Sequence, residues 1–321
     1  MRSSRFSRVL LAAVTLVVAA ASCSSGDTDK KRNRSRDSED DETQEVGVPA
    51  KDVLRKPGDD RPTKPSPGNK GTGVDTDDPT KLVYLLSRSN QLHSFNPKIG
   101  GLAAYHLVGT LDCKKAFGTP QSMAVDRQGW AWVFYDSKQL FKVSVRDATC
   151  SEPLQYKHPA RNPQLGMGFT SVSPGSAEER LYIMSPEFGL ATIGMPSLAV
   201  SPTRRLAQGA ELTGGGDAKL FLYAAQKREL SEIDLSTLTT RPMHSFTSVG
   251  EVGAWAFARY AGKFYLFTSD GYVPSRATEF DPKTNIEKVR DQNIGFVVVG
   301  AGQSTLVPPP DTDSSISGDW P

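Results

Sequence analysis

The segment GFVVVGAGQST, residues 295–305, decides the fold of this protein. Phe296 and the three valines after it predict a β-strand, and the small residues that follow predict a turn. The remaining stretch, LVPPPDTDSSISGDWP at 306–321, contains no partner strand and is predicted to be a disordered tail. A new strand at the end of a domain therefore has to pair with a strand from elsewhere in the chain, because open strand edges promote aggregation.

Related strings precede this segment at spacings of 42 to 47 residues. They begin at Ser122, Phe169, Glu211 and Ala254. A second apolar string follows each by roughly 9 to 12 residues, as in AWVFY at 131–135 and FYLFT at 264–268. A third string, turn residues such as NPKIGG and DPKTN, and a weaker fourth string complete each unit. A period of about 40–45 residues with four short strands is typical of a β-propeller blade.

The first unit, which starts at Leu82, lacks its own innermost strand. GFVVVG at 295–300 is the missing strand, so the two ends of the domain are predicted to pair and close the ring. We expect an all-β, five-bladed propeller over residues 81–305, with six blades if two units have been merged. A β-sandwich is the alternative, but it gives no reason for the ordered repeat.

The chain begins with MRSSRFSRVLLAAVTLVVAAASC. Three arginines precede an apolar run that ends near Ala21 and is shorter than the roughly 20 apolar residues of a membrane-spanning helix. The pattern predicts a signal peptide over residues 1–22. Residues 20–23, AASC, resemble a bacterial lipobox, although Ala20 stands where leucine is usual. The resemblance implies cleavage before Cys23, acylation of its thiol and its new amine by chains such as palmitate, and anchoring in a membrane. Ordinary cleavage and secretion is the alternative.

Residues 23–80 carry many charges and few large apolar side chains. This composition predicts a disordered tether. Ser24 stands where aspartate is common in lipoproteins kept at the inner membrane, which favours the outer membrane. Whether the domain faces the periplasm or the medium stays open. The formal net charge of +2 argues against a nucleic-acid partner.

The strings SMAVDRQGWAWV at 122–133 and GFVVVGAGQST resemble those of predicted bacterial envelope lipoproteins that carry a small propeller, a largely uncharacterised group. The resemblance covers the lipobox and most of residues 81–305. It implies a fold and a location, and no activity comes with it.

Two cysteines remain once Cys23 is assigned to lipid. In an oxidising compartment Cys113 and Cys150 are predicted to form a disulfide bond. The strand order raises an objection, because in a regular four-stranded blade the two positions lie toward opposite faces of the ring. The segment CKKAFGTPQ at 113–121 is long enough to bend and bring them together.

No sequence motif indicates catalysis, a metal or another cofactor. The chain has neither H-E-x-x-H nor G-x-S-x-G, and His93 and His106 are predicted to face solvent. Arg259 is predicted to be ordinary surface.

Propellers present ligands at the ends of the central axis, on the loops that enter the innermost strands. Besides Thr119 and Pro120, the candidate ligand face consists of Gln121, Met167, Glu211, Trp255 and Asn293. Trp255 is either a core side chain between blades or an aromatic platform for a sugar or peptide group.

These observations favour a non-enzymatic binding or scaffold module for an envelope protein or glycan. An axial metal-dependent lactonase, hydrolase or lyase is the enzymatic alternative, but the entering loops hold few ligand residues. A purely structural member of an envelope complex is the third possibility.

Overall fold

The computed structural model describes residues 78–250 and 252–307. The predicted signal peptide, the predicted lipid-attachment residue Cys23, nearly all of the predicted tether and most of the predicted tail lie outside these residues. Within the described ranges no helix has the length and apolar character needed to cross a membrane.

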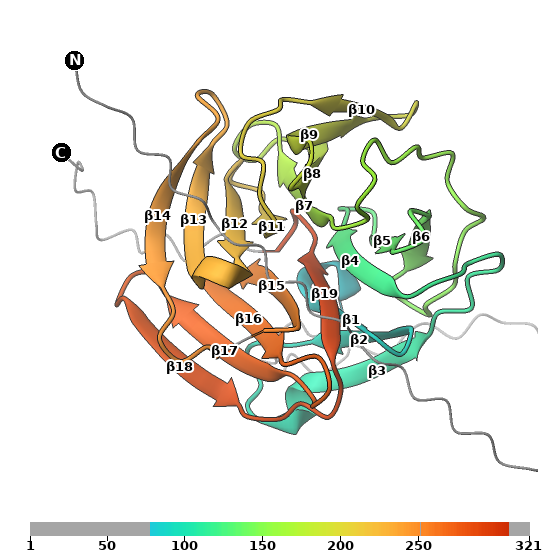
Figure 1. The fold of residues 1–321 in the computed structure, drawn as a ribbon. Helices are drawn as coiled ribbons and strands as arrows, with labels where there is room; N and C mark the ends of the chain where they lie inside the picture. Colours follow the sequence, from blue (N-terminus) through green and yellow to red (C-terminus); the bar gives the residue numbers. More distant parts are fainter. Residues whose placement is uncertain (1–77, 251, 308–321) are drawn as a thin grey trace, which may run out of the picture. The chain divides into compact units, whose positions relative to one another are not determined.

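Five antiparallel sheets form a ring, as Figure 1 shows, so the five-bladed propeller is confirmed. Blade 1 consists of β19 (Val298–Gln303), β1 (Val83–Ser87), β2 (Gln91–Phe95) and β3 (Tyr105–Thr110). Blade 2 consists of β4 (Pro120–Val125), β5 (Trp130–Tyr135) and β6 (Leu140–Ser144). Blade 3 consists of β7 (Gly166–Ser171), β8 (Glu179–Ser185), β9 (Gly189–Gly194) and β10 (Ala199–Pro202). Blade 4 consists of β11 (Glu211–Gly214), β12 (Leu220–Ala224), β13 (Glu229–Asp234) and β14 (Thr239–Ser245). Blade 5 consists of β15 (Ala254–Tyr260), β16 (Lys263–Ser269), β17 (Arg276–Asp281) and β18 (Ile286–Asp291). Short 3₁₀ turns occupy Pro79–Lys81, Leu102–Ala104 and Ala225–Lys227.

The C-terminal strand closes the ring as predicted. β19 (red) pairs antiparallel with β1 (blue) at the centre of Figure 1. Its boundaries differ from the prediction, because the strand starts at Val298 and contains the small residues expected to form a turn. These residues are small because β19 lies close to β4. A Cβ on Gly300 would stand 2.9 Å from the backbone nitrogen of Met123, and one on Gly302 would stand 3.0 Å from that of Val125.

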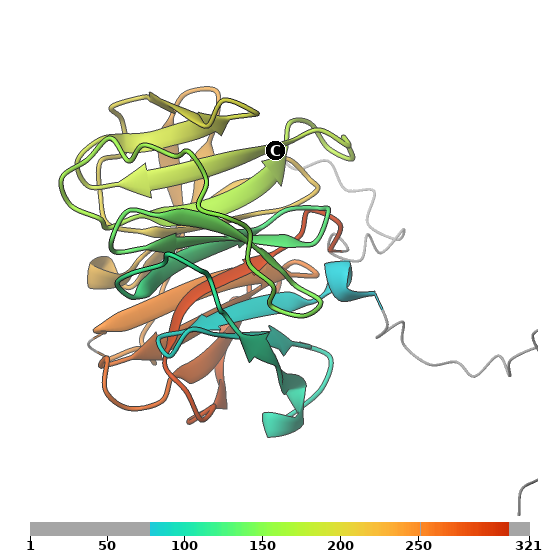
Figure 2. The ribbon, with the colours of Figure 1, turned by 90° about the vertical axis from the view of Figure 1, so that its right-hand side faces the viewer.

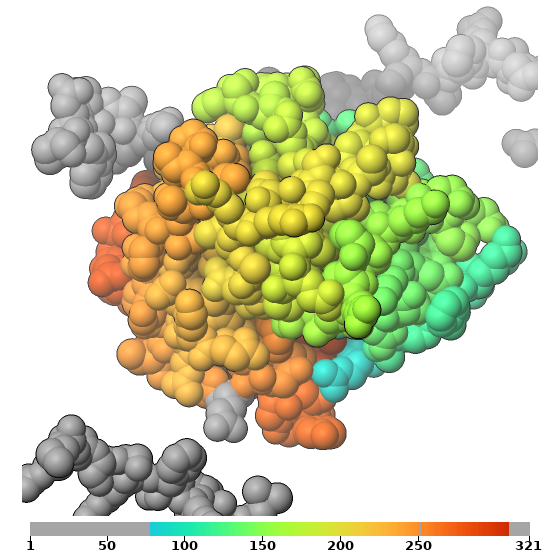
Figure 3. Space-filling view, turned by 45° about the horizontal axis from the view of Figure 1, so that its top comes forward, coloured from blue at the N-terminus to red at the C-terminus, as the bar shows by residue number. Residues whose placement is uncertain are grey.

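The hydrophobic core lies between adjacent blades. The innermost and second strands are almost entirely buried, whereas the outer strands β3, β10, β14 and β18 alternate between partly buried and exposed residues. Phe95 of blade 1, for example, packs edge-on against Tyr265 and Phe267 of blade 5, with ring centroids 5.4 and 5.5 Å apart. Figure 3 faces blades 3 and 4 (yellow-green to orange), whose side chains pack together on this flank.

Blade 2 has three regular strands, and an irregular segment replaces the fourth. Figure 2 faces this side of the ring. The nitrogens of Ser151 and Leu154 donate to carbonyls of β6 over 2.8 and 2.9 Å, and Cys150 forms an isolated bridge with Val143. The outer edge of β6 is therefore covered without a regular ladder.

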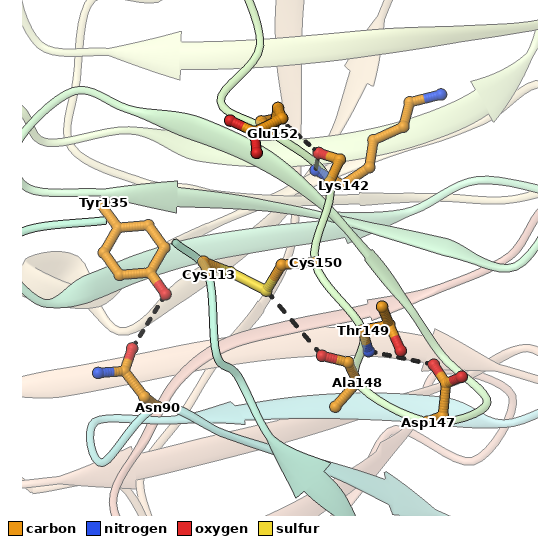
Figure 4. The surroundings of a disulfide bond; sticks show 10 residues. Asn90, Cys113, Tyr135, Lys142, Asp147, Ala148, Thr149, Cys150 and Glu152 are labelled. Atoms are coloured by element: carbon orange, nitrogen blue, oxygen red, sulfur yellow. Dashed lines mark hydrogen bonds between the residues drawn. A yellow bond between two sulfur atoms is a disulfide. The ribbon is translucent and has the colours of Figure 1, made fainter. Parts of the chain in front are cut away.

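A disulfide bond holds this irregular segment against blade 1, so the predicted pairing is confirmed. Cys113 and Cys150 are joined with their Cα atoms 5.0 Å apart (Figure 4). The expected separation toward opposite faces was wrong, because blade 2 lacks the regular outer strand on which that objection rested. Nearby, the Tyr135 hydroxyl donates to the Asn90 side chain over 3.0 Å and links the same two blades.

His106 is exposed as predicted, but the same prediction for His93 was wrong. His93 is buried in β2, and its ring stacks on Phe296 with centroids 3.8 Å apart. Burial lowers the pKa of His93 to about 4. The prediction failed because the segment that crosses from blade 5 to blade 1 covers this face of β2 with Phe296.

Candidate functional site

A cavity of about 380 Å³ opens at the end of the axis where the innermost strands begin. All five blades contribute to it through residues at or just before the start of these strands: Pro120 and Gln121, Leu165, Glu211, Ala254 and Trp255, and Val299. Its size falls in the range of roughly 300–1,000 Å³ that is common for small-ligand sites. The cavity is therefore built jointly by the whole ring.

Glu211 is the most deeply buried polar group of this cavity. It begins β11, is 6% exposed, and its Oε2 accepts a hydrogen bond from the Ser122 hydroxyl of β4 over 3.0 Å. Burial raises the pKa of Glu211 well above its usual value, although the hydrogen bonds from Ser122 and the Met167 backbone act in the opposite direction. No cation pairs with it among the described residues. Burial thus favours the protonated form of Glu211, which has an O–H to donate.

Gln121 brings an unpaired amide to the same cavity. Its Oε1 is shielded from water, yet no described residue donates to it. A buried acceptor without a donor is rare and destabilising in folded proteins, and such a group is often paired by a bound water or ligand.

Trp255 forms part of the wall. It is half-buried, and it packs against the apolar cluster between blades 4 and 5 while also lining the cavity. Trp255 is therefore a core residue on one side and lines the cavity on the other, and its role as an aromatic platform stays a prediction.

Arg88 and Asp136 are the charged residues at this cavity besides Glu211. The Arg88 guanidinium donates to the Gly271 carbonyl. The two carboxylate oxygens of Asp136 accept from the Thr119 nitrogen and hydroxyl over 2.9 and 2.7 Å. One cation and one anion thus balance each other at a site where burial raises the pKa of the deepest acid, Glu211.

The structure brings three of the five predicted residues together. Gln121, Glu211 and Trp255 line the cavity, as do Thr119 and Pro120. Met167 is fully buried in the core between blades 2 and 3. The Asn293 side chain accepts from the Gly295 nitrogen in an exposed turn before β19 and does not line the cavity.

Sequence reasoning missed Arg88, Asp136 and Gln164, which also line the cavity. Arg88 and Asp136 follow the second strands of blades 1 and 2. A signal for them was present, because in an up-and-down meander the turn after the second strand lies at the same end as the start of the first. Gln164 lies in the irregular segment before β7, for which no pattern was available.

The opposite end of the axis is nearly closed by hydrogen bonds, and the space that remains is about 20 Å³. Gln303, the last residue of β19, donates to the Thr213 hydroxyl over 2.9 Å and to the Gly214 carbonyl, and accepts from the Arg259 nitrogen over 3.2 Å. The prediction that Arg259 is ordinary surface was wrong. Its side chain is 11% exposed and donates to both carboxylate oxygens of Asp217 over 2.9 and 2.7 Å.

A larger groove of about 750 Å³ lies between blades 2 and 3. Two of its acidic side chains are paired within the protein. Asp126 accepts from the backbone of the β4–β5 turn and from the Trp132 indole, and Glu179 accepts from the Arg127 nitrogen and the Thr305 hydroxyl. The axial cavity, with an unpaired amide and a buried acid whose pKa is raised, is the stronger candidate for a binding site. Residues 78–250 and 252–307 include no cluster of three or more His, Cys, Asp or Glu side chains that would hold a metal ion.

No protein-family model and no curated protein sequence matches this chain. Among solved structures, a virginiamycin B lyase from Staphylococcus aureus is similar at 15% identity and a TM-score of 0.37, covering 69% of this chain and 72% of that chain. A streptogramin B lyase is similar at 12% identity and a TM-score of 0.38, with 65% of each chain covered. A chain of a nidogen/laminin complex is similar at 6% identity and a TM-score of 0.45, covering 69% of this chain and 97% of that chain. Similarity at this level carries no information about activity or ligand.

Proposed function

We propose that this protein is a bacterial lipoprotein, anchored through Cys23, whose propeller binds an envelope protein or glycan without catalysing a reaction. The anchor is inferred from the lipobox-like residues 20–23. The outer membrane is the proposed location, and the polar residues 24–80 serve as the tether to the propeller. The site of binding is the axial cavity.

The observation that carries the binding proposal is the combination of groups at the open end of the axis. An unpaired amide, a buried acid whose pKa is raised and an aromatic side chain surround one cavity of about 380 Å³. Few convergent polar groups on a largely preformed concave surface are typical of a ligand site.

The enzymatic alternative, a hydrolase, lactonase or lyase with an axial metal, has less support. Metal-dependent chemistry needs several anionic or imidazole ligands that converge. In the described part of the cavity the acidic residues are Glu211, whose pKa is raised by burial, and Asp136, whose two oxygens are both bonded to Thr119.

Crosslinking in cells tests the binding proposal. A photoreactive amino acid at Gln121 is expected to crosslink one or two envelope components reproducibly, because that side chain lines the cavity. The matched control carries the same group at Ile286, an exposed residue of β18 on the outside of blade 5. Equal patterns from both positions, or no adduct at Gln121, would contradict the proposal.

Fatty-acid labelling tests the anchor separately. The wild-type protein is expected to incorporate labelled palmitate and to sediment with membranes, whereas Cys23→Ala does neither. Labelling that persists in Cys23→Ala would contradict anchoring through this residue.

A further inference from the structure

We propose that the axial cavity takes a neutral, hydroxyl-bearing ring, the terminal saccharide of an envelope glycan, which stacks on Trp255 and exchanges hydrogen bonds with Gln121 and Glu211. This inference rests on the proposed binding function and specifies its ligand class.

The deepest polar groups of the cavity call for a ligand that both donates and accepts. Gln121 offers an acceptor, Oε1, that has no donor among the described residues. Glu211 in its neutral form offers an O–H, while its Oε2 is already occupied by Ser122. A hydroxyl group donates and accepts at once, so adjacent hydroxyls on one ring satisfy both residues.

The charge balance favours a neutral ligand over an ionic one. Arg88 and Asp136 contribute one charge of each sign, and burial disfavours a charge on Glu211. An anionic ligand meets the carboxylate of Asp136, and one guanidinium nitrogen of Arg88 is already used by the Gly271 carbonyl, which leaves fewer donors for an anion. A cationic ligand meets Arg88 and requires either the ionisation of Glu211 or the burial of an unpaired charge.

Trp255 supplies the apolar surface that a saccharide ring needs. Its side chain is held by the apolar cluster between blades 4 and 5, so the indole is fixed before the ligand arrives. A large aromatic face with a polar edge suits a ring that is apolar on its faces and polar around its rim.

A protein partner fits this cavity less well. Protein–protein binding concentrates its free energy in buried aromatic or aliphatic anchors that fill apolar pockets. Here the Gln121 Oε1, which lacks a partner, is polar and lies inside a small recess. In the groove between blades 2 and 3, Asp126 and Glu179 already accept hydrogen bonds from within the protein.

The test uses the full-length chain in detergent and a panel of common neutral hexoses, N-acetylhexosamines and their disaccharides. Each hexose is accompanied by its amino sugar and its uronic acid, which place a positive or a negative charge on the same ring. Saturation-transfer NMR and tryptophan fluorescence titrations measure binding. At least one neutral saccharide is expected to bind, with an affinity at least about tenfold above that of its charged counterparts.

Two variants and one control link binding to the cavity. Gln121→Leu and Trp255→Leu are expected to weaken binding by about tenfold or more. Gln121→Leu removes no hydrogen bond with the described residues and is expected to stay folded. It therefore still tests the cavity if Trp255→Leu is unstable. Trp130→Phe changes a half-exposed tryptophan of β5 that does not line the cavity, and its affinity is expected to match the wild type.

The remaining outcomes separate this inference from the proposed function. Tighter binding of the amino sugars or uronic acids overturns the neutral-ligand inference, while binding at the cavity as such stands. If no saccharide binds but a crosslinker at Gln121 captures an envelope protein, the saccharide inference fails and the binding function survives. If neither saccharide binding nor crosslinking is found, both proposals fail.

Discussion

The two ends of the propeller axis are built from the same five strands but use their polar residues in opposite ways. Where the innermost strands end, Gln303, Thr213, Arg259 and Asp217 are bonded to one another, and only the Nε of Arg259 lacks a partner. Where the strands begin, the Gln121 Oε1 has no partner among the described residues, and Glu211, which accepts from Ser122, lies beside a cavity with its pKa raised by burial. One end stabilises the ring, and the other leaves its hydrogen-bonding capacity to a ligand.

Small residues do not set this contrast, because Gly166 at the open end and Gly214 at the closed end both lie against the backbone of a neighbouring strand. Polar groups also pair at the open end, where the Ser122 hydroxyl of β4 donates to Glu211 of β11 over 3.0 Å. The difference lies in the Gln121 Oε1, which has no donor among the described residues, and in the cavity of about 380 Å³ beside it.

The largest expected effect comes from weakening the ring without touching either end. Replacing Cys113 and Cys150 together by serine removes the 37-residue crosslink between blades 1 and 2 and is expected to lower the free energy of unfolding by about 3–4 kcal/mol. Denaturant unfolding measures this loss. A change of less than about 1 kcal/mol would show that the irregular segment of blade 2 holds its place without the bond.

The closed end is tested by Gln303→Leu. This change leaves the Thr213 hydroxyl, the Gly214 carbonyl and the Arg259 nitrogen without their partner in a buried setting, and about 1–3 kcal/mol is typical for such a group. We expect a loss of about 3 kcal/mol in unfolding free energy, because relaxation pairs some of these groups again. Thermal and denaturant unfolding of the purified protein measure this loss. An unchanged free energy of unfolding would contradict the structural role of this end.

The neutral acid at the open end predicts a pH dependence. Because burial raises the pKa of Glu211 in the folded state, the folded protein holds a proton that the unfolded chain releases near its ordinary value. The stability associated with this proton is fully present below the unfolded pKa and is lost as the pH rises toward the folded pKa. Glu211→Gln, which keeps the shape without the titration, is expected to lose less stability than the wild type between pH 5 and pH 9. Parallel pH profiles of the two proteins would contradict a neutral Glu211.

The smallest effect on stability is expected for Gln121→Leu. The amide makes no hydrogen bond with the described residues, so its replacement should change the free energy of unfolding by less than about 0.5 kcal/mol. Gln121→Glu serves as a comparison, because it adds a charge beside Glu211 and is expected to destabilise the protein more. A large loss in Gln121→Leu would show that the amide serves the fold rather than a ligand.

The repeat in the sequence was sufficient to predict the ring, because the order of apolar strings and turns records the meander of each blade. Closure by the last strand and the disulfide bond followed from the missing strand of blade 1 and from two unassigned cysteines. The exact register was less accessible. The tight approach of β19 to β4 explains why the run of small residues at 300–302 belongs to the strand, and this approach is a tertiary contact that no local pattern encodes.

The sequence predicted the residues of the candidate site only where it also predicted the starts of the innermost strands. Gln121, Glu211 and Trp255 were singled out because they lie where innermost strands begin, and they line one cavity. The burial of His93 beneath Phe296 and the pairing of Arg259 with Asp217 depend on contacts between residues far apart in the chain. Such contacts become visible only when the blades are placed around a common axis.

The most direct test of the central contrast is a paired measurement on Gln121→Leu and Gln303→Leu. Each variant is titrated with the neutral saccharide that binds the wild type best, and its unfolding free energy is measured in the same buffer. The account predicts that Gln121→Leu loses binding and keeps its stability, whereas Gln303→Leu loses stability and, while folded, binds as the wild type does. The reverse pattern, or equal losses of both properties in both variants, would contradict the division of the axis into a binding end and a structural end.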